Sequence, residues 1–302
     1  MNLTLFAPVV LFVYARADHT QRTLTALSAN PEAKDTDLII YADAARHEKD
    51  VTAVQAVRDL ISNVIGFKSV TLHLREQNVG LAQNIIEGVT QVSQQYGRVI
   101  VLEDDIVTSP AFLGFMNAAL DKYQTEPRVW HISGWNYPMR SEQSLPETFF
   151  WRTMNCWGWA TWADRWQHFK KEPAKLVDNW SAAEIESFNL DGAYDFWPQV
   201  TANHQGKLNT WAIFWYATIF AHKGLCLNPT RSFVANIGHD GSGENCGTKD
   251  VYKTTLATGF NKQWPTKLIE NSTAVELIQY FYRSLKPSLL RRILSKIKRV
   301  FI

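Results

Sequence analysis

The first hundred residues alternate short apolar runs with longer segments whose apolar positions recur at helical spacing. Short apolar runs bounded by polar residues are typical of strands buried on both faces, and the longer segments are typical of helices that cover a sheet. In chain order we predict strand 9–14, helix 20–27, strand 37–41, helix 48–65, strand 69–74, helix 80–96 and strand 99–102. This βαβαβαβ order predicts an α/β fold with a parallel sheet flanked by helices.

Polar residues follow each predicted strand of this half. They are residues 15–18 with Arg16, residues 42–43 with Asp43, residues 75–78 with Asn78, and residues 103–105. Open parallel sheets bind ligands beyond the carboxyl ends of their strands, so these residues are candidates for a binding site. No G-x-G-x-x-G motif follows the first strand and no G-x-x-x-x-G-K-[ST] motif occurs, which disfavours a Rossmann dinucleotide enzyme and a P-loop NTPase.

Three acids, Glu103, Asp104 and Asp105, end the fourth predicted strand. Adjacent carboxylates repel one another, and a divalent cation removes that cost, with hard oxygen ligands favouring Mg²⁺ or Mn²⁺. Such a cation can bridge a diphosphate and stabilise a departing phosphate. The alternative is that Asp104 or Asp105 caps a turn while Glu103 is solvated. Receiver domains and aspartate phosphatases place their acids after a first strand, which this triplet does not match.

Composition indicates a globular chain. Its 302 residues are 46% hydrophobic and 20% charged, without a tract dominated by proline or glycine. Three scattered cysteines predict neither a disulfide framework nor a thiolate zinc site and favour a reducing compartment. Residues 3–14 are too few to span a bilayer and follow no basic residue, so we interpret them as a buried strand. We therefore expect a cytoplasmic protein.

Basic residues are concentrated near the C-terminus. The formal net charge is +2, yet seven Lys and Arg residues and no acid follow Glu276. The rest of the chain has 24 bases against 29 acids, so the overall charge gives no reason to expect nucleic acid as a partner. Within 289–301, apolar residues at helical spacing alternate with bases and predict a basic amphipathic helix. We expect this helix to contact the cytoplasmic membrane surface, with docking on its own domain as the alternative.

Tryptophan divides the chain in another way. None occurs in the first 129 residues, and eleven occur in the next 86. Broad indole faces can stack on sugar rings, and buried tryptophan is also ordinary core material. The distribution predicts two functional regions, and for any single tryptophan a place in the core is the better expectation.

The order of these segments resembles the GT-A fold of nucleotide-sugar glycosyltransferases, with the acidic triplet at the position of their DxD motif. Residues 101–105 and 109–113 are similar to the Glu-Asp-Asp segment of N-acetylglucosaminyltransferase I, as are residues 132–136, Ile-Ser-Gly-Trp-Asn. Residues 157–162 and 236–243 resemble bacterial glycosyltransferases of surface-polysaccharide clusters. The resemblance spans residues 5–250.

The resemblance implies roles for particular residues. Contacts with the nucleotide or donor sugar would come from Arg16, Asp43, Asn78, Gly80, Glu103 and Asp104. Asp43 would contact the uracil or ribose, Asp105 would bind Mn²⁺ or Mg²⁺ directly, and His239 is a candidate for a further metal ligand. Acceptor contacts are assigned to Trp135, Trp157, Trp159 and Trp211. The alternatives are a surface cation for Arg16, a turn former for Asn78 and a solvent-facing imidazole for His239.

The catalytic base is left open. An inverting transferase needs a carboxylate that takes the proton of the acceptor hydroxyl. The resemblance predicts a Trp-Asp-Asp-Trp segment, but the counterpart here, residues 211–215, reads Trp-Ala-Ile-Phe-Trp and contains no acid. Replacement candidates are Asp240, Glu244, and the pair Asp191 and Asp195. Asp240 leads because it lies in a glycine-rich loop after the predicted strand 232–236, with a turn-forming Asp as the alternative.

We therefore predict one GT-A domain over residues 1–265, with a nucleotide-sugar-binding half 1–127 and an acceptor half 128–265, followed by a basic helical tail 266–302. The resemblance implies metal-dependent transfer of a sugar, with inversion, from a nucleotide-diphosphate donor to a glycan or lipid-linked glycan. UDP-GlcNAc is the first choice of donor, and surface polysaccharide or lipopolysaccharide assembly is the implied pathway. The alternatives are a nucleotidyltransferase and a glycan-binding protein on a catalytically degenerate scaffold.

Overall fold

The computed structural model describes residues 6–139, 144–241 and 250–285. The first half contains β1 (Val9–Val13), α1 (Ala17–Ser28), η1 (Ala33–Asp35), β2 (Asp37–Ala42), η2 (Glu48–Asp50), α2 (Val51–Ile61), β3 (Ser69–Leu74), α3 (Leu81–Tyr96) and β4 (Arg98–Glu103). The seven predicted elements are thus confirmed with small shifts of their ends. The predicted helix 48–65 is shorter, because its start is a 3-10 turn and α2 ends at Ile61.

The second half mixes short strands with short helices. They are β5 (Ile106–Thr108), α4 (Phe112–Tyr123), β6 (Val129–Ser133), β7 (Thr148–Trp151), β8 (Trp159–Trp162), α5 (Ala163–Trp166), α6 (Pro173–Asn179), α7 (Ala182–Phe188), α8 (Trp197–His204), α9 (Ala212–Ala221), β9 (Leu225–Pro229), β10 (Val234–Asn236) and α10 (Ser272–Leu285). The predicted strand 232–236 is found as β10.

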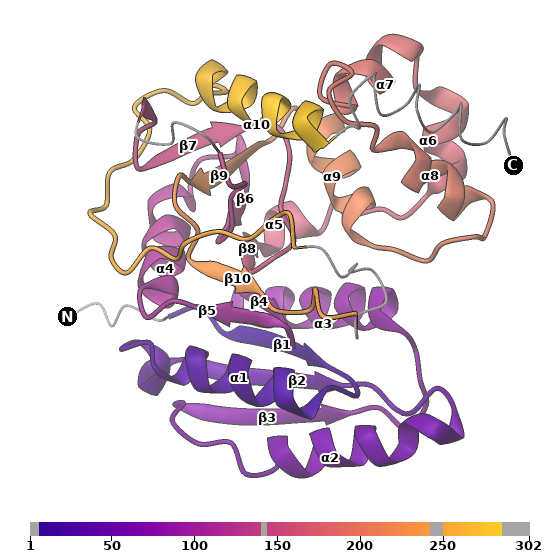
Figure 1. The fold of residues 1–302 in the computed structure, drawn as a ribbon, viewed down its shortest axis with the longest axis vertical. Coiled ribbons are helices and arrows are strands. Elements are labelled where there is room, and N and C mark those ends of the chain that lie inside the picture. Colours follow the sequence, from indigo (N-terminus) through magenta and orange to yellow (C-terminus); the bar gives the residue numbers. More distant parts are fainter. Residues whose placement is uncertain (1–5, 140–143, 242–249, 286–302) are drawn as a thin grey trace, which may run out of the picture.

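An eight-stranded sheet runs through both halves in the order β3-β2-β1-β4-β8-β6-β9-β7 (Figure 1). Strands β1 to β4 are parallel to one another, β6 is parallel to β9, and β8 and β7 run antiparallel to the strands beside them. A separate two-stranded ribbon pairs β10 with β5. The structure therefore confirms the predicted α/β class, with a mostly parallel central sheet flanked by helices.

The strand order reverses beside β1. The chain moves outward from β1 to β2 and β3, and then returns to β4 on the other side of β1. Right-handed crossovers put α1 and α2, which pack together, on one face of the sheet and the returning helix α3 on the other. Open α/β sheets bind ligands at such a reversal, beyond the carboxyl ends of the strands, which here are the ends of β1 and β4.

Aromatic side chains fill the core of the second half. Trp159 is fully buried and stacks on Trp211 with a centroid distance of 5.2 Å, and Trp166 packs between Trp159 and Trp215. Each such ring removes a large apolar area from water, so this cluster stabilises the short helices against the sheet. The uneven distribution of tryptophan is thus largely a property of this core.

The last described helix, α10, docks on the domain through its buried residues Ala274, Ile278 and Tyr282. The hydroxyl groups of Tyr282 and Tyr137 share a hydrogen bond of 2.7 Å. The predicted basic amphipathic helix within 289–301 lies outside the described residues. Among the described helices, none is long and apolar enough to cross a membrane.

A neutral histidine lies in the middle of the aromatic core. His131 has no exposed surface, its Nδ1 accepts a hydrogen bond from Trp215 Nε1 at 3.3 Å, and its Nε2 lies 3.1 Å from the Asn155 carbonyl. Because indole only donates, the ring hydrogen is on Nε2, which donates to the carbonyl. Burial lowers the pKa of His131 to about 3, so the ring stays neutral.

We expect the stability contributed by His131 to fall in acid. The folded pKa lies below the unfolded value of about 6.5, so the unfolded chain binds the proton first and stability is lost as pH falls below 6.5. The free energy of unfolding of the wild type, relative to His131→Gln, should decrease by about 2 kcal/mol between pH 7 and pH 5. Urea unfolding at both pH values measures this difference, and an unchanged difference would contradict the neutral assignment.

Candidate functional site

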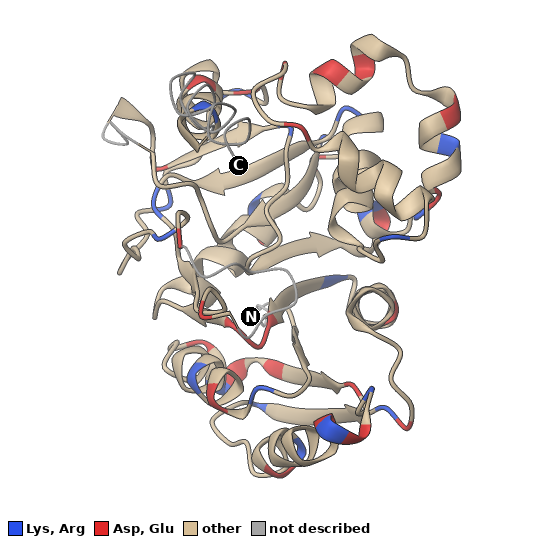
Figure 2. Ribbon diagram, turned by 45° about the vertical axis from the view of Figure 1, so that its right-hand side comes forward, with Lys and Arg blue, Asp and Glu red and all other residues tan. Residues whose placement is uncertain are grey.

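An arginine and two acids meet where the strand order reverses. Arg16 follows β1, Asp104 and Asp105 follow β4, and these two strands are adjacent and parallel. The Arg16 guanidinium binds Asp104 through two hydrogen bonds, Nε to Oδ2 at 3.3 Å and Nη2 to Oδ1. Arg16 Nη2 also lies 2.9 Å from Asp105 Oδ2. Two of the four polar strand ends, those after β1 and β4, therefore meet directly, and Figure 2 shows the charged segments along the chain.

The acids of this cluster are buried, so the protonation of each carboxyl depends on the charges of its neighbours. Asp104 and Asp105 are 5% and 7% exposed. Burial raises the pKa of Asp104, while the hydrogen bonds and charge of Arg16 oppose that rise. Burial and the neighbouring charges of Asp105 and Asp104 raise the pKa of Glu103 to about 8, so this carboxyl is mostly protonated at neutral pH. Arg16 and a proton on Glu103 thus relieve the repulsion among the three acids.

One face of α1 supports the acids. Positions 16, 19 and 23 are spaced by three and four residues, so Arg16, His19 and Thr23 share a helix face. Thr23 Oγ1 donates to the Asp104 carbonyl at 2.7 Å. His19 is close enough that its positive form lowers the pKa of Asp104. The sequence reasoning missed His19 and Thr23, although this helical spacing from Arg16 was a usable signal.

The segment after β10 packs directly on the acids. β10 pairs with β5, and the Ile237 amide donates to the Asp105 carbonyl at 2.9 Å. A Cβ atom on Gly238 would lie 2.3 Å from Asp105 Oδ2 and 3.1 Å from Arg16 Nη1. Only glycine fits this close approach, so the glycine-rich loop that follows β10 begins in contact with the acids.

The next two residues place an imidazole and a carboxylate beside this contact. The His239 side chain is 10% exposed, and neither ring nitrogen has a hydrogen-bond partner within the described part of the chain. Its ring packs against Trp157 and Tyr252, and its Nε2 lies 4.0 Å from Asp250 Oδ1. Tyr252 and Asp250 were not predicted, because no motif in the sequence connects them to His239.

Asp240 faces outward at the same edge. Its side chain is 50% exposed, and its Oδ2 lies 3.2 Å from His19 Nε2. This distance joins the loop after β10 to α1, so the leading candidate for the base lies beside the residues that surround Asp104.

A second acid shapes the predicted nucleotide-binding loop. Asp43 is buried, and its Oδ1 accepts from the amides of Ala44 and Val79 at 2.9 and 3.0 Å. Its Oδ2 accepts from the Gly80 amide at 2.9 Å and from Asn78 Nδ2 at 3.1 Å. Gly80 has a φ of +78°, which favours glycine, and it precedes α3. Since these bonds use its acceptor positions, Asp43 acts here on the shape of the loop 78–80.

The described side chains do not form a ready cation site. Both acids that would supply hard oxygen ligands are paired with Arg16. Within residues 6–139, 144–241 and 250–285, no group of three or more His, Cys, Asp or Glu is arranged to hold a metal ion. As placed, these residues therefore do not fit Mn²⁺ or Mg²⁺, and ligation by Asp105 and His239 stays a prediction.

The other candidates for the base are not brought to this site. Asp191 accepts from Arg152 at 3.2 Å and from Gln279 at 3.3 Å, and Arg152 also binds Glu270. These contacts connect the segment after α7 to α10, so Asp191 has a structural role. Asp195 accepts from Asn189 at 2.8 Å within the same segment. Glu244 lies outside the described residues.

The predicted acceptor tryptophans separate into two groups. Trp159 and Trp211 stack on each other inside the core, and neither presents a face to solvent in this structure. Trp135 is also buried, with its ring 4.7 Å from that of Trp157. Trp157 is partly exposed and packs on His239, so among these four residues it is the one placed to meet a ligand near the acids.

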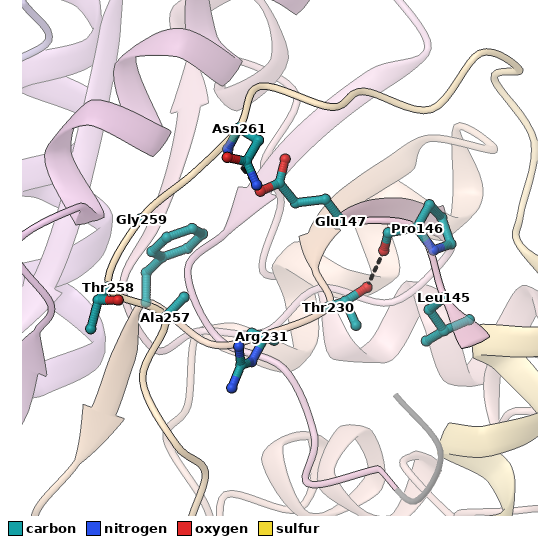
Figure 3. A pocket seen from close by; sticks show the side chains of 10 residues that line it. Leu145, Pro146, Glu147, Thr230, Arg231, Ala257, Thr258, Gly259 and Asn261 are labelled. Carbon is teal, nitrogen blue, oxygen red and sulfur yellow. Dashed lines mark hydrogen bonds between the residues drawn. The ribbon is translucent and has the colours of Figure 1, made fainter. Parts of the chain in front are cut away.

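A separate cavity of about 500 Å³ lies at the other end of β10 (Figure 3). It is lined by Leu145, Pro146, Glu147, Thr230, Arg231, Phe233, Ala257, Thr258, Gly259 and Asn261. The Glu147 carboxylate accepts from the amides of Asn261 and Gln263 at 2.8 and 2.9 Å, which holds the rim together. None of the residues predicted from sequence lines this cavity.

No family model matches the chain, and no curated protein matches it in sequence. Among solved structures it is similar to the mannosyltransferase PcManGT from Pyrobaculum calidifontis in complex with GDP-Man and Mn²⁺, at 13% identity over 73% of this chain and 70% of that chain, with a TM-score of 0.39. The galactosyltransferase LgtC with donor and acceptor sugar analogs gives 8% identity, 70% of each chain and a TM-score of 0.36. UDP-glucose pyrophosphorylase complexed with UDP-glucose gives 11% identity, 74% and 90% coverage and a TM-score of 0.35. At these values the similarities carry no argument about the reaction.

We expect Gly238→Ala to destabilise the protein. The added methyl group would meet Asp105 Oδ2 at 2.3 Å, and Arg16 holds that carboxylate in place. Overpacking of this kind costs about 1–3 kcal/mol. Gly259→Ala is the matched control, because no atom lies within 4 Å of its added methyl group. Thermal unfolding of both variants measures the effect, and equal stability would show that the loop after β10 does not press on Asp105.

Proposed function

We propose that the chain is a GT-A glycosyltransferase that uses a nucleotide-diphosphate sugar. The observation that carries the proposal is the cluster of Arg16, Asp104 and Asp105 at the carboxyl ends of β1 and β4, where the strand order reverses. Guanidinium groups match phosphate geometry, and carboxylates beside a diphosphate suit a bridging divalent cation. The site therefore has the charges that a departing nucleoside diphosphate requires.

For the donor, we assign binding of the diphosphate to Arg16. Binding of the nucleoside is assigned to Asp43 and the loop 78–80. Four hydrogen bonds, to Asp43 and to the Ala44 carbonyl, fix the shape of that loop, and a preformed loop lowers the entropy lost on binding. Binding of Mn²⁺ or Mg²⁺ by Asp105 and His239 rests on the sequence resemblance, because the acids as placed are paired with Arg16. A UDP donor, with UDP-GlcNAc first, rests on the sequence resemblance.

The acceptor half of the proposal places the acceptor hydroxyl near Asp240. This carboxylate is half exposed and lies beside His19, so it can take a proton and return it to solvent. The acceptor is proposed to be a glycan or lipid-linked glycan of surface polysaccharide or lipopolysaccharide assembly, with inversion at the anomeric carbon. The tail 266–302 would hold the enzyme at the cytoplasmic membrane surface, and partly exposed Trp157 would contact the acceptor.

We expect UDP-sugars with Mn²⁺ to raise the apparent melting temperature, since a ligand at 100 times its Kd adds about 2.7 kcal/mol to stability. Asp105→Asn should remove the metal-dependent part of the shift. Asp121→Asn, which alters an acid paired with Arg98, should retain it. A thermal-shift panel of nucleoside diphosphates and nucleotide sugars, with and without Mn²⁺, makes the measurement.

Two results would redirect the proposal. In the thermal-shift panel extended to glycans, stabilisation by glycans without any nucleotide would favour a glycan-binding protein. In a separate activity assay, formation of a nucleoside triphosphate and a sugar phosphate from a nucleotide sugar and pyrophosphate would identify a nucleotidyltransferase.

We expect Asp240→Asn to lower kcat for sugar transfer by about 10²-fold or more, in the range attributed to a general base. The nucleotide-induced thermal shift should persist in this variant, because the carboxylate lies outside the Arg16 cluster. Asp191→Asn should leave kcat nearly unchanged, because Asp191 is engaged with Arg152. Steady-state kinetics with the donor identified by thermal shift test both variants, and the reverse pattern would assign the base to Asp191.

A further inference from the structure

The cavity beside Phe233 has walls that hydrogen bonds of the protein hold in place. Three chain segments surround it, 145–147, 230–233 and 257–261. The Glu147 carboxylate accepts from the Asn261 amide at 2.8 Å, and Thr230 Oγ1 donates to the Pro146 carbonyl at 2.5 Å. These bonds connect the first segment to each of the other two. The space of about 500 Å³ is therefore preformed, and its size lies in the range of small-molecule sites.

The two charged side chains of the lining, Arg231 and Glu147, have opposite signs. Figure 3 shows Glu147 beside Asn261 on one side of the space and Arg231 on the other. An anion bound between them would be repelled by the Glu147 carboxylate, and a cation would be repelled by the Arg231 guanidinium. A ligand without net charge avoids both repulsions. The lining therefore favours a neutral ligand.

The lining also offers both donors and acceptors of hydrogen bonds. The exposed side chains of Thr258 and Asn261 make no hydrogen bond to the described part of the chain. Thr230 Oγ1 donates its hydrogen to a carbonyl and can still accept. Each Glu147 oxygen accepts one backbone amide and has a further acceptor position. A ligand that fills the cavity must therefore bring several groups that can donate or accept.

A sugar unit meets these requirements. Its hydroxyl groups both donate and accept, and its C–H faces can lie on the apolar part of the lining, which includes Leu145, Pro146 and Ala257. A wholly apolar ligand would remove water from the polar groups of the cavity without replacing its hydrogen bonds, which is costly. The chemistry of the lining therefore selects a neutral sugar over an ion or a lipid chain.

We propose that the cavity binds a neutral sugar unit of the acceptor glycan, at a distance from the hydroxyl that reacts. Phe233 lines the cavity just before β10, and Gly238, beyond the other end of β10, lies against Asp105. At about 3.3 Å per residue, an extended chain separates the two by about 16 Å. A glycan that reaches both must therefore have several sugar units. The sugar site itself rests on the cavity, whereas its use by the acceptor rests on the proposed function.

The experiment measures sugar binding to the full chain by saturation-transfer difference NMR, without nucleotide. The neutral probes are glucose, galactose, mannose and N-acetylglucosamine, and the anionic probes are glucuronate and glucose 6-phosphate. At least one neutral sugar should bind, and the anionic sugars should bind more weakly. Combining Thr258→Ala with Asn261→Ala should weaken binding of the neutral sugar about tenfold, because two hydrogen-bonding partners are lost. Both side chains are exposed, so this double variant should keep the melting temperature of the wild type.

Gln263→Ala is the matched control. Gln263 is exposed and follows the third segment, and its side chain does not line the cavity. It binds Glu147 through its backbone amide, which alanine keeps. This variant should bind the sugar like the wild type. A loss as large as that of the double variant would overturn the assignment of the sugar to this cavity.

Steady-state kinetics test whether the acceptor uses this site. With an acceptor of several sugar units, the double variant should raise KM and leave kcat unchanged. With only the terminal sugar that reacts, both parameters should equal those of the wild type. A KM that changes for neither acceptor, or equally for both, would overturn the role in acceptor binding.

Three results would overturn the sugar site itself. The first needs only the wild type and so does not depend on the folding of a variant: no binding of any neutral probe. The second is tighter binding of an anionic probe than of any neutral one, and the third is equal binding by the wild type and the double variant. If UDP-sugars still stabilise the wild type, the proposed function survives these failures. If a neutral sugar binds in the cavity but no nucleotide stabilises the wild type, the proposed function fails and the sugar site remains.

Discussion

The ion pair between Arg16 and the acids after β4 is the interaction on which the site depends. Three consecutive acids at the end of a buried strand repel one another and lose hydration, and both effects disfavour their charged forms. A positive group must lie among them or the carboxyls must be protonated. The protein uses both solutions, since Arg16 binds Asp104 and Asp105, and the raised pKa of Glu103 keeps its proton near neutral pH. The parallel pairing of β1 with β4 brings the two chain segments together.

The second half of the chain contributes to this site through its backbone. β10 pairs with β5, which begins directly after the acids, and this ribbon delivers Ile237 and Gly238 to Asp105. The aromatic core around Trp159 holds β8 and β6 beside β4, so the sheet on which the acids stand is continuous across both halves. A site that depends on contacts of a few ångströms needs such a rigid support.

The sequence could predict the elements of the first half because apolar periodicity is a local signal. It could also predict that Arg16 and Asp105 share a sheet edge, since parallel strands align their ends. It could not predict that Arg16 would bind the acids themselves, because side-chain direction depends on the packing of α1 and the loop after β10. The structural use of Asp191 was hidden for a similar reason, since its partner Arg152 is 39 residues away in sequence. Residue type alone did not separate Trp159 in the core from the partly exposed Trp157.

The acids of the site differ in their exposure to water, and this difference suits them to different chemical roles. Asp104 and Asp105 are buried against a fixed guanidinium, so they are suited to hold charge in place. Asp240 is half exposed and faces an imidazole, so it can exchange protons with solvent. An acid that holds a cation must stay ionised through the reaction, whereas a base must gain and lose a proton within it. One site can therefore carry both tasks, because Arg16, just before α1, faces the buried pair and His19, in the first turn of α1, faces the exposed acid.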